Sequence, residues 1–285
     1  MKIATYLGSQ GPSYGVVDGE RIVDLGCRIG AVYSDLRAVL AAGALDVAQR
    51  AVKGAPADYR LSEVTFLPVV PNPRRIICAG LNYEEHRVEG NRPKTSDPAL
   101  FIRLPESQVG HLRDLVVPAE TKQFDYEGEV ALVIGKAGRR IDAATALRHV
   151  AGYACYNDGS ARDVQLATSQ WTPGKNFPRT GAFGPWLALC DELPADTVMT
   201  LVTRLNGQEM QRAKTDMMIF SIPRLISFIS AFTTLEPGDV IVTGTPGGVG
   251  LRRNPPVFMK PGDRVEVEVS GIGTLVNNVV AEVVS

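Results

Sequence analysis

The amino-acid sequence predicts a strand-rich α+β protein with a small N-terminal α/β unit, residues 1–70, and a larger domain, residues 75–285. Its 285 residues exceed a typical single domain, so a second, smaller unit is expected. Three prolines between residues 68 and 73 interrupt regular structure and indicate a linker. Seven short β-rich segments and only one clear helix follow that linker, which argues against a doubly wound parallel sheet.

The N-terminal unit is predicted to contain a strand, a hairpin and a helix. The strand lies in "KIATYLG" (2–8), and "YGVVDGERIVDL" (14–25) favours a hairpin with "VDGE" as its turn. Apolar spacing suited to a helix follows in "DLRAVLAAGALDVAQRAV" (35–52). This unit contributes no motif with a chemical role.

The larger domain contains one strand with a clear one-sided pattern and one clear helix. In "RVEVEV" (264–269) the three valines share one face and the charged residues share the other, which is typical of an antiparallel strand. In "SIPRLISFISAFTTL" (221–235), Ser221 suits the N-cap and Pro223 lies in the first turn, where proline is tolerated. The other predicted strands are "RIICAGLN", "EVALVIG", "VAGYACYND", "GPWLALCDEL", "TLVTRLNGQ" and "DVIVTGTP".

Composition and charge exclude several classes of partner. Apolar residues make up 45% of the chain and charged residues 21%, as in a soluble globular protein. A formal net charge of −1 predicts neither a nucleic-acid nor an anionic-membrane partner. No apolar run approaches the roughly 20 residues that span a bilayer, and the N-terminus lacks a signal-peptide core. The four cysteines form no C-x-x-C pair and favour buried free thiols, so we expect a cytoplasmic protein.

One stretch, "FDYEGEVALVIG" (124–135), combines an apolar strand with three acids. Successive side chains of a strand alternate between its faces, so Asp125, Glu127 and Glu129 are predicted to point the same way. Such a face meets either water or a positive partner.

A second acidic segment favours the positive partner. "YACYNDGSARDVQ" (153–165) leaves an apolar strand and presents Asp158 directly after it, where sites are often built. If Glu127, Glu129 and Asp158 converge, their mutual repulsion calls for a cation. Three carboxylates without a cysteine indicate Mg²⁺ or Mn²⁺, while the three histidines lack zinc-ligand spacing. An exposed acidic strand edge is the alternative.

Two further segments offer a general base and a cation. In "GLNYEEHRVEG" (80–90), His86 and Glu89 are adjacent on one face if the segment is helical, and a carboxylate can hold an imidazole in one tautomer. A surface helix with incidental charges is the alternative. In "WTPGKNFPRTGAFGPW" (171–186), Lys175 lies in a loop rich in glycine and aromatic residues. Considered alone, such a lysine is an ordinary solvated side chain.

The glycine-rich stretch "DVIVTGTPGGVG" (239–250) is not a nucleotide-binding loop. No helix can follow it in "LRRNPPVFMKPGD", and it contains no G-K-[ST] sequence. A tight loop that brings backbone N–H groups and Thr245 to a small anionic substrate is the favoured interpretation.

Taken in order, these motifs resemble those of the fumarylacetoacetate hydrolase family. The resemblance runs from Arg75 to the C-terminus, about three quarters of the chain. Its motifs are "GLNYEEH", "DYEGEVALVIG", "GYACYNDGSARDVQ", "WTPGKNF", "GPW", "LEPGDVIVTGTPGGVG" and "GDRVEVEVSGIGTL".

The resemblance implies a mixed β-roll catalytic domain, usually dimeric, that holds Mg²⁺ or Mn²⁺ through carboxylates. By motif, the metal ligands are Glu127, Glu129 and Asp158. His86 and Glu89 activate the catalytic water from a segment that is a mobile lid in relatives. The residues expected around the substrate are Arg162, Gln165, Lys175 and Thr245.

Two departures from the family pattern border the predicted pocket. Many relatives have Asp after the Phe of "GKxF", where this chain has Pro178 followed by Arg179, and relatives often carry Lys in place of Arg103. We expect both changes to leave the metal intact and to alter the substrate. Arg179 is expected to bind a second carboxylate at the far end of the substrate.

The predicted activity is hydrolytic C–C cleavage of an acylpyruvate such as maleylpyruvate or fumarylpyruvate, in aromatic-compound catabolism. The products are pyruvate and a carboxylic acid, with Lys175 stabilising the pyruvate enolate that leaves. An oxaloacetate-type β-keto acid decarboxylase or a 2-hydroxyhepta-2,4-diene-1,7-dioate isomerase is the runner-up, because fold and metal do not determine the reaction. A non-catalytic metal-binding protein is the third possibility. The expected assembly is a homodimer.

Overall fold

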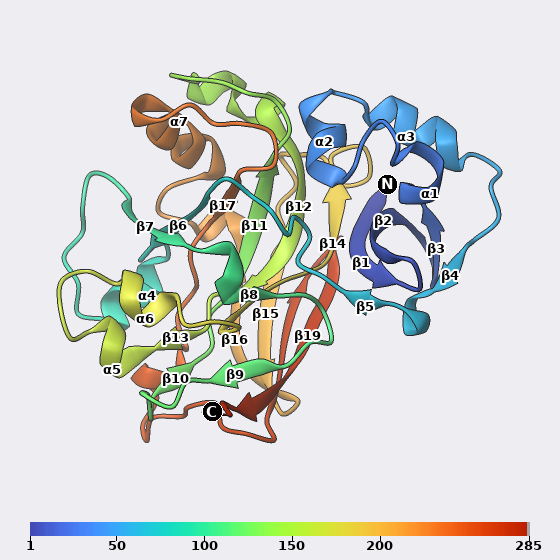
Figure 1. Ribbon diagram of the computed structural model, residues 1–285. Coiled ribbons are helices and arrows are strands. Elements are labelled where there is room, and N and C mark those ends of the chain that lie inside the picture. Colours follow the sequence, from blue (N-terminus) through green and yellow to red (C-terminus); the bar gives the residue numbers. More distant parts are fainter. Residues whose placement is uncertain (284–285) are drawn as a thin grey trace.

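A mixed sheet of twelve strands runs through the whole protein (Figure 1). The computed structural model describes residues 1–283. Ten strands follow one another across the sheet, while β5 pairs with β1 and β8 pairs with β14. In order they are β4 (Tyr59–Arg60), β3 (Arg21–Asp24), β2 (Gly11–Asp18), β1 (Lys2–Gly8), β14 (Gly181–Leu189), β12 (Val150–Asn157), β11 (Gly128–Ile134), β17 (Val240–Val242), β6 (Ile76–Gly80) and β7 (Ala99–Arg103), with β5 (Thr65–Phe66) and β8 (Gln108–Val109) beside them.

A second sheet of five strands packs its apolar face against the first. The valines of "RVEVEV" are each 1% exposed, as the one-sided pattern predicts. They join the large hydrophobic core that also contains Val130, Leu132 and Ile134 of β11. The five strands, in order, are β16 (Gln208–Lys214), β15 (Thr200–Leu205), β18 (Arg264–Val269), β19 (Gly273–Ala281) and β9 (Leu115–Val117).

The helices are short, and α7 is the longest of those in the described part of the chain. It begins after Ser221, whose position is that of an N-cap although its side chain makes no capping hydrogen bond, and it contains the predicted proline. No helix among the described residues has the length and apolarity needed to cross a membrane. The helices are α1 (Gly26–Ile29), α2 (Leu36–Ala41), α3 (Leu45–Val52), α4 (Glu84–Glu89), α5 (Arg162–Gln165), α6 (Thr172–Lys175) and α7 (Ile222–Phe232), with 3₁₀ turns η1 (Leu61–Glu63), η2 (Pro105–Ser107), η3 (Ala143–His149), η4 (Thr215–Met217) and η5 (Gly250–Arg252).

Two local predictions were wrong, one about a helix of the N-terminal unit and one about the burial of the cysteines. The single helix expected over residues 35–52 is divided into α2 and α3, because Gly43 adopts a φ of +63°, a left-handed conformation that ends a helix. Cys27 is exposed and not buried, and Cys190 is only half-buried, although all four cysteines are free thiols. The predicted hairpin is confirmed, with Asp18 opposite Arg21 across its turn.

The N-terminal unit shares the large sheet with the rest of the protein. Strand β1 pairs antiparallel with β14, with Lys2 opposite Ala188 and Ile3 opposite Leu187. The predicted linker lies between β5 and β6, and residues 284–285 of the predicted 75–285 domain lie outside the described residues. The division into two domains stays a prediction.

Strand β11 explains the contrast between acids and apolar residues in "FDYEGEVALVIG". Both of its faces are buried, since Ala131 and Val133 belong to a second core on the opposite side from Val130. The expected continuous strand is broken, however, because Phe124–Asp125 form β10 and pair with β13 (Ser160–Ala161), while β11 begins only at Gly128. A side chain at position 128 would lie 1.9 Å from the Thr203 hydroxyl, so glycine is required between the two glutamates.

Candidate metal centre and active site

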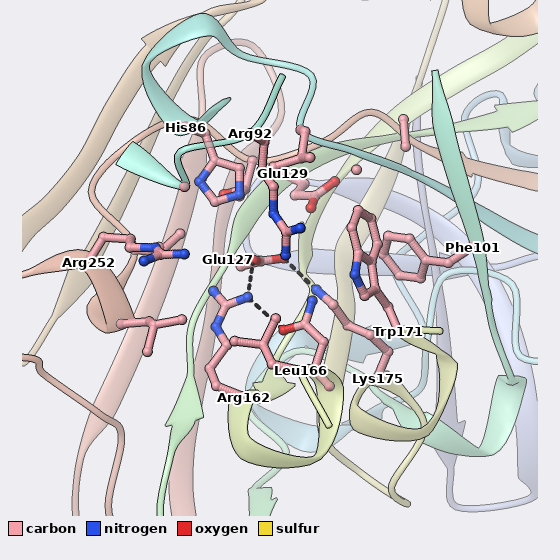
Figure 2. A pocket seen from close by; sticks show the side chains of 18 residues that line it. His86, Arg92, Phe101, Glu127, Glu129, Arg162, Leu166, Trp171, Lys175 and Arg252 are labelled. Atoms are coloured by element: carbon pink, nitrogen blue, oxygen red, sulfur yellow. Dashed lines mark hydrogen bonds and ion pairs between the residues drawn. The ribbon is translucent and has the colours of Figure 1, made fainter. Parts of the chain in front are cut away.

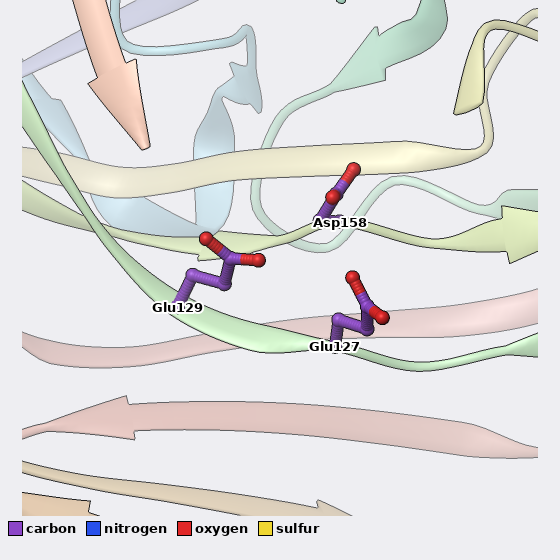
Figure 3. Close-up of side chains that lie close together, drawn as sticks. All are labelled: Glu127, Glu129 and Asp158. Carbon is purple, nitrogen blue, oxygen red and sulfur yellow. The ribbon is translucent and has the colours of Figure 1, made fainter. Parts of the chain in front are cut away.

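Three buried carboxylates converge where β11 begins and β12 ends (Figure 3). Gly128 pairs with Asn157 across these two antiparallel strands, so Asp158 is a neighbour of Glu127 and Glu129 although about 30 residues separate it from them along the chain. One oxygen from each lies within 4.8 Å of the others, and none of the three side chains is more than 6% exposed. The predicted convergence is present in the structure.

Buried cations compensate two of these carboxylates but not the third. Lys175 Nζ lies 2.6 Å from Glu127 and 2.6 Å from Asp158, and Arg162 Nη1 lies 2.7 Å from Glu127. Arg103 pairs with Asp158 from behind. In the described part of the chain, Glu129 has no cationic partner and accepts a hydrogen bond only from the backbone N–H of Gly244.

The two glutamates therefore differ in pKa. Burial raises the pKa of Glu129 well above its usual value, and the neighbouring charges of Asp158 and Glu127 raise it further. Burial acts the same way on Glu127, but the charges of Arg162 and Lys175 outweigh it and lower its pKa. The three carboxylates together offer hard oxygen ligands, and one of them, Glu129, has no cation among the described residues to balance its charge. The three residues fit a divalent cation of the Mg²⁺ or Mn²⁺ type.

A histidine–carboxylate pair lies beside this cluster. The residues are on α4, as predicted, and His86 Nδ1 is 2.7 Å from Glu89 Oε1. The other carboxylate oxygen of Glu89 accepts the Gly248 N–H at 2.9 Å, so Glu89 connects α4 to the glycine-rich loop. The carboxylate favours the tautomer with hydrogen on Nδ1 and leaves Nε2 of His86 free to accept a proton.

The glycine-rich loop was expected to present its backbone N–H groups to a substrate, but several of them bind carboxylates of the protein itself. The N–H of Gly244 binds Glu129, and those of Gly250 and Leu251 bind Asp125 at 2.8 and 2.9 Å. The Thr245 hydroxyl donates to the carbonyl of Gly128 and accepts from Gln211. The loop thus holds the site's own carboxylates in place. Thr245 lines the pocket, but its proton is already used.

Asp125 supports the cluster without joining it. Its carboxylate is fully buried and lies 2.9 Å from Arg162 Nε, and the same guanidinium then reaches Glu127. Strict alternation placed Asp125 with the two glutamates, but it lies in β10 and not in β11, and its carboxylate binds the N–H groups of Gly250 and Leu251 outside the cluster. Arg162 also donates to Gln165 Oε1 at 3.0 Å, and its Nη2 is buried without a partner among residues 1–283.

Lys175 is a buried residue of the site and not a solvated loop lysine. It ends α6 and is 1% exposed. A side chain at Gly174 would lie 2.3 Å from the backbone nitrogen of Gln165, so this glycine lets α6 pack directly on α5. Burial lowers the pKa of Lys175, but the charges of Asp158 and Glu127 outweigh it and raise the pKa, which keeps the side chain cationic.

Several of these groups line one pocket of about 600 Å³, its open mouth included, while Asp125, Asp158 and Glu89 lie outside its lining (Figure 2). His86, Glu127, Glu129 and Lys175 lie inside it, and Trp171 and Phe101 form an apolar wall with their rings edge to face at 5.7 Å. The remaining residues of the lining include Gly80, Leu81, Gly90, Arg92, Arg162, Gln165, Leu166, Thr245, Val249, Leu251 and Arg252.

Comparison with known proteins decides the family. The family model described as "Fumarylacetoacetate (FAA) hydrolase C-terminal" matches residues 75–280. The chain belongs to the fumarylacetoacetate hydrolase family. It is 41% identical over 238 residues to a mitochondrial oxaloacetate tautomerase of Homo sapiens, a match that covers 83% of this chain and 76% of the relative.

Solved structures of family enzymes share the fold over nearly the whole chain. The fumarylacetoacetate hydrolase from Exiguobacterium antarcticum is 35% identical, with a TM-score of 0.84, covering 99% of this chain and 100% of that one. A maleylpyruvate hydrolase from a Sphingobium species, solved with manganese(II) and pyruvate, is 27% identical with a TM-score of 0.83 and the same coverage. The strand-rich mixed fold and the family are thus confirmed. The manganese complex and the acidic cluster both indicate a divalent metal.

The structure corrects both expectations about departures from the family pattern. Arg179 is exposed, does not line the pocket, and donates to the carbonyl of Asp114 at 3.2 Å. It has a left-handed φ of +58°, which turns the chain after α6. Arg103 lies behind the metal cluster, where it binds Asp158, Gly159 and Thr180, so it supports the metal site and not the substrate.

Arg103→Met should lower the affinity for the metal about 10- to 100-fold, the usual cost of losing a residue that orients a ligand. Asp158 would keep Lys175 but lose the guanidinium that holds its other oxygen. Arg103→Lys should retain most of the affinity because the charge remains. Metal titration by calorimetry measures this, and wild-type affinity in Arg103→Met would show that Arg103 does not position Asp158.

Sequence reasoning missed several residues of the site. Arg92 and Arg252 line the pocket. In the sequence, Arg92 lies in "GNRP", which indicated only that a helical segment ends there. Arg252 lies in "LRRNPP", which indicated only that no helix follows the glycine-rich stretch. Asn82 is fully buried and donates to the carbonyls of Thr243 and Phe220, which joins the start of the α4 segment to the body. An asparagine inside an otherwise apolar strand end was the available signal.

Proposed function

We propose that this protein is a metal-dependent enzyme that interconverts the keto and enol forms of a 2-oxo acid, with oxaloacetate as the leading candidate. The observation that carries this proposal is the His86–Glu89 pair beside three converging carboxylates, with His86, Glu127 and Glu129 lining one pocket. Enolisation needs a base at carbon and positive charge near the oxo oxygen. His86 can act as the base, and the carboxylates would hold a divalent cation that supplies the positive charge. The 41% identity to an oxaloacetate tautomerase supports this reaction over others.

In this mechanism His86 moves one proton. Nε2 accepts it from C3 of the substrate, the C–H electrons form the C2–C3 double bond, and the carbonyl electrons move to the oxygen. The imidazolium, stabilised by Glu89, then returns the proton to that oxygen. Glu127, Glu129 and Asp158 would hold a divalent cation, which would supply a Lewis acid for the developing negative charge.

The other buried charged groups are held in fixed positions before a substrate binds. Lys175 holds its charge between Glu127 and Asp158, and Arg162 does the same between Asp125 and Glu127. The fixed donors need no rearrangement as charge moves to the oxygen. Trp171 and Phe101 form an apolar wall on one side.

Acylpyruvate hydrolysis is the second candidate, supported by the fold shared with a maleylpyruvate hydrolase. His86 would then take its proton from a water, the resulting hydroxide would attack the distal carbonyl, and the C–C bond would break with pyruvate enolate as the leaving group. Decarboxylation of a β-keto acid or isomerisation of a hydroxydienedioate would form a related enolate.

Product analysis separates these reactions. The Mn²⁺-loaded protein should accelerate the approach of oxaloacetate to its keto–enol equilibrium, followed by the ultraviolet absorbance of the enol, and EDTA should abolish the effect. Pyruvate formation from maleylpyruvate, fumarylpyruvate and acetylpyruvate is measured in parallel. Rapid release of pyruvate without accelerated tautomerisation would replace the first candidate with the second.

The setting of this activity is part of the same proposal. The metal is Mg²⁺ or Mn²⁺, the substrate is a small 2-oxo acid, and no nucleic acid or membrane takes part. The protein acts in the cytoplasm as a homodimer, and a hydrolase with this site would serve aromatic-compound catabolism.

A further inference from the structure

Two arginines without ion-pair partners stand at the mouth of the pocket. Arg92 follows α4 and Arg252 ends η5, and Figure 2 shows their side chains reaching the pocket from different elements. Arg87, also in the α4 segment, pairs with Glu84. Across residues 1–283, by contrast, neither Arg92 nor Arg252 forms an ion pair or donates a side-chain hydrogen bond to another residue.

The backbones of both arginines are anchored although their guanidinium groups are free. The carbonyl of Arg92 accepts a hydrogen bond from the Arg87 side chain, which ties it to the helix that carries His86. Arg252 directly follows Gly250 and Leu251, whose N–H groups bind the buried carboxylate of Asp125. An anchored backbone with a free charged end is suited to binding an anion that enters from solvent.

The charges of the inner site can be balanced without Arg92 and Arg252. Counted as ionised, the four buried carboxylates of the site exceed its three buried cations by one. A divalent cation reverses that balance to one positive charge, which a single substrate carboxylate neutralises. Two additional positive charges at the mouth are therefore available to a second anionic group. The buried carboxylates are Asp125, Glu127, Glu129 and Asp158, and the buried cations are Arg103, Arg162 and Lys175.

We propose that Arg92 and Arg252 bind the second carboxylate of a dicarboxylic 2-oxo acid and so set the substrate class of this enzyme. The inference rests on the proposed function for the inner end, where the 2-oxo carboxylate binds at the metal. The apolar wall of Trp171 and Phe101 faces the carbon chain between the two ends. Arg92 and Arg252 are specificity residues and transfer no proton. Arg179, which sequence reasoning assigned to this role, is outside the pocket.

A binding experiment with two stable acids tests this without turnover. 2-Oxoglutarate and 2-oxopentanoate share their 2-oxo acid end, and a carboxylate in the first replaces a methyl group in the second. Calorimetry on the Mn²⁺-loaded protein should show at least tenfold tighter binding of 2-oxoglutarate. Arg92→Ala and Arg252→Ala should each remove roughly tenfold of that affinity, the lower end for a charged hydrogen bond at a partly exposed site. Binding of 2-oxopentanoate should stay unchanged.

Arg179→Ala is the matched control, because it removes an exposed arginine outside the pocket and should change neither affinity. Arg92→Lys and Arg252→Lys should recover part of the loss, which separates charge from packing. Equal losses for both acids, or no preference in the wild type, would overturn the inference and leave the proposed function standing. If neither acid binds the wild-type protein, both fail together.

Discussion

Glu129→Gln should abolish tight metal binding and, with it, activity. Glu129 is the one carboxylate of the cluster without a cationic partner in the described part of the chain, so the divalent ion is its natural counter-charge. Losing a ligand should cost more than the about 100-fold that loss of an outer residue costs. Elemental analysis and calorimetric titration measure the effect. Stoichiometric metal at wild-type affinity in this variant would remove Glu129 from the site.

The same substitution should leave the metal-free protein folded. It should also change how the free energy of unfolding depends on pH. The native pKa of Glu129 is raised above 4.5, so at pH values above 4.5 the unfolded chain loses a proton that the native protein keeps. The free energy of unfolding of the metal-free wild type should therefore fall as pH rises through this range. Glutamine cannot titrate, so Glu129→Gln should show a weaker fall. Thermal unfolding in EDTA at several pH values compares the two.

His86→Ala should slow tautomerisation about 10²- to 10⁴-fold, the usual contribution of a general base. The substitution removes the one imidazole that lines the pocket and leaves the three carboxylates untouched, so metal affinity should remain near wild type. Acylpyruvate hydrolysis, if present, should fall similarly because it needs the same base. Decarboxylation of oxaloacetate should fall much less, because it requires only the metal and a route for a proton.

His149→Ala is the matched control for this prediction. His149 bonds through Nδ1 to the carbonyl of Lys136 and does not line the pocket, so its loss should leave all rates unchanged. Glu89→Gln should give an intermediate loss, because it keeps the side chain's shape but weakens control of the imidazole tautomer. A rate within twofold of wild type in His86→Ala would remove the proton-transfer role from this residue.

Local patterns were sufficient to predict the strand-rich fold and the centre of the site. A period-two pattern identified β18 because this strand buries one face, and a continuous apolar run identified β11 because both of its faces are buried. The spacing of His86 and Glu89 predicted their contact because residues three apart are neighbours on any helix. Asp158 was predicted to belong to the site because it directly follows an apolar strand, where polar side chains often form sites.

Only the tertiary structure decided which charges face the substrate. Arg179 and Lys175 are four residues apart, yet α6 buries the lysine against two carboxylates and the chain then turns the arginine into solvent. The glycine-rich loop binds Glu89, Glu129 and Asp125 because distant segments bring those carboxylates to its N–H groups. Arg92 and Arg252 become neighbours of one pocket only through folding. Electrostatic partners of this kind depend on distance in space, and spacing along the chain does not carry that information.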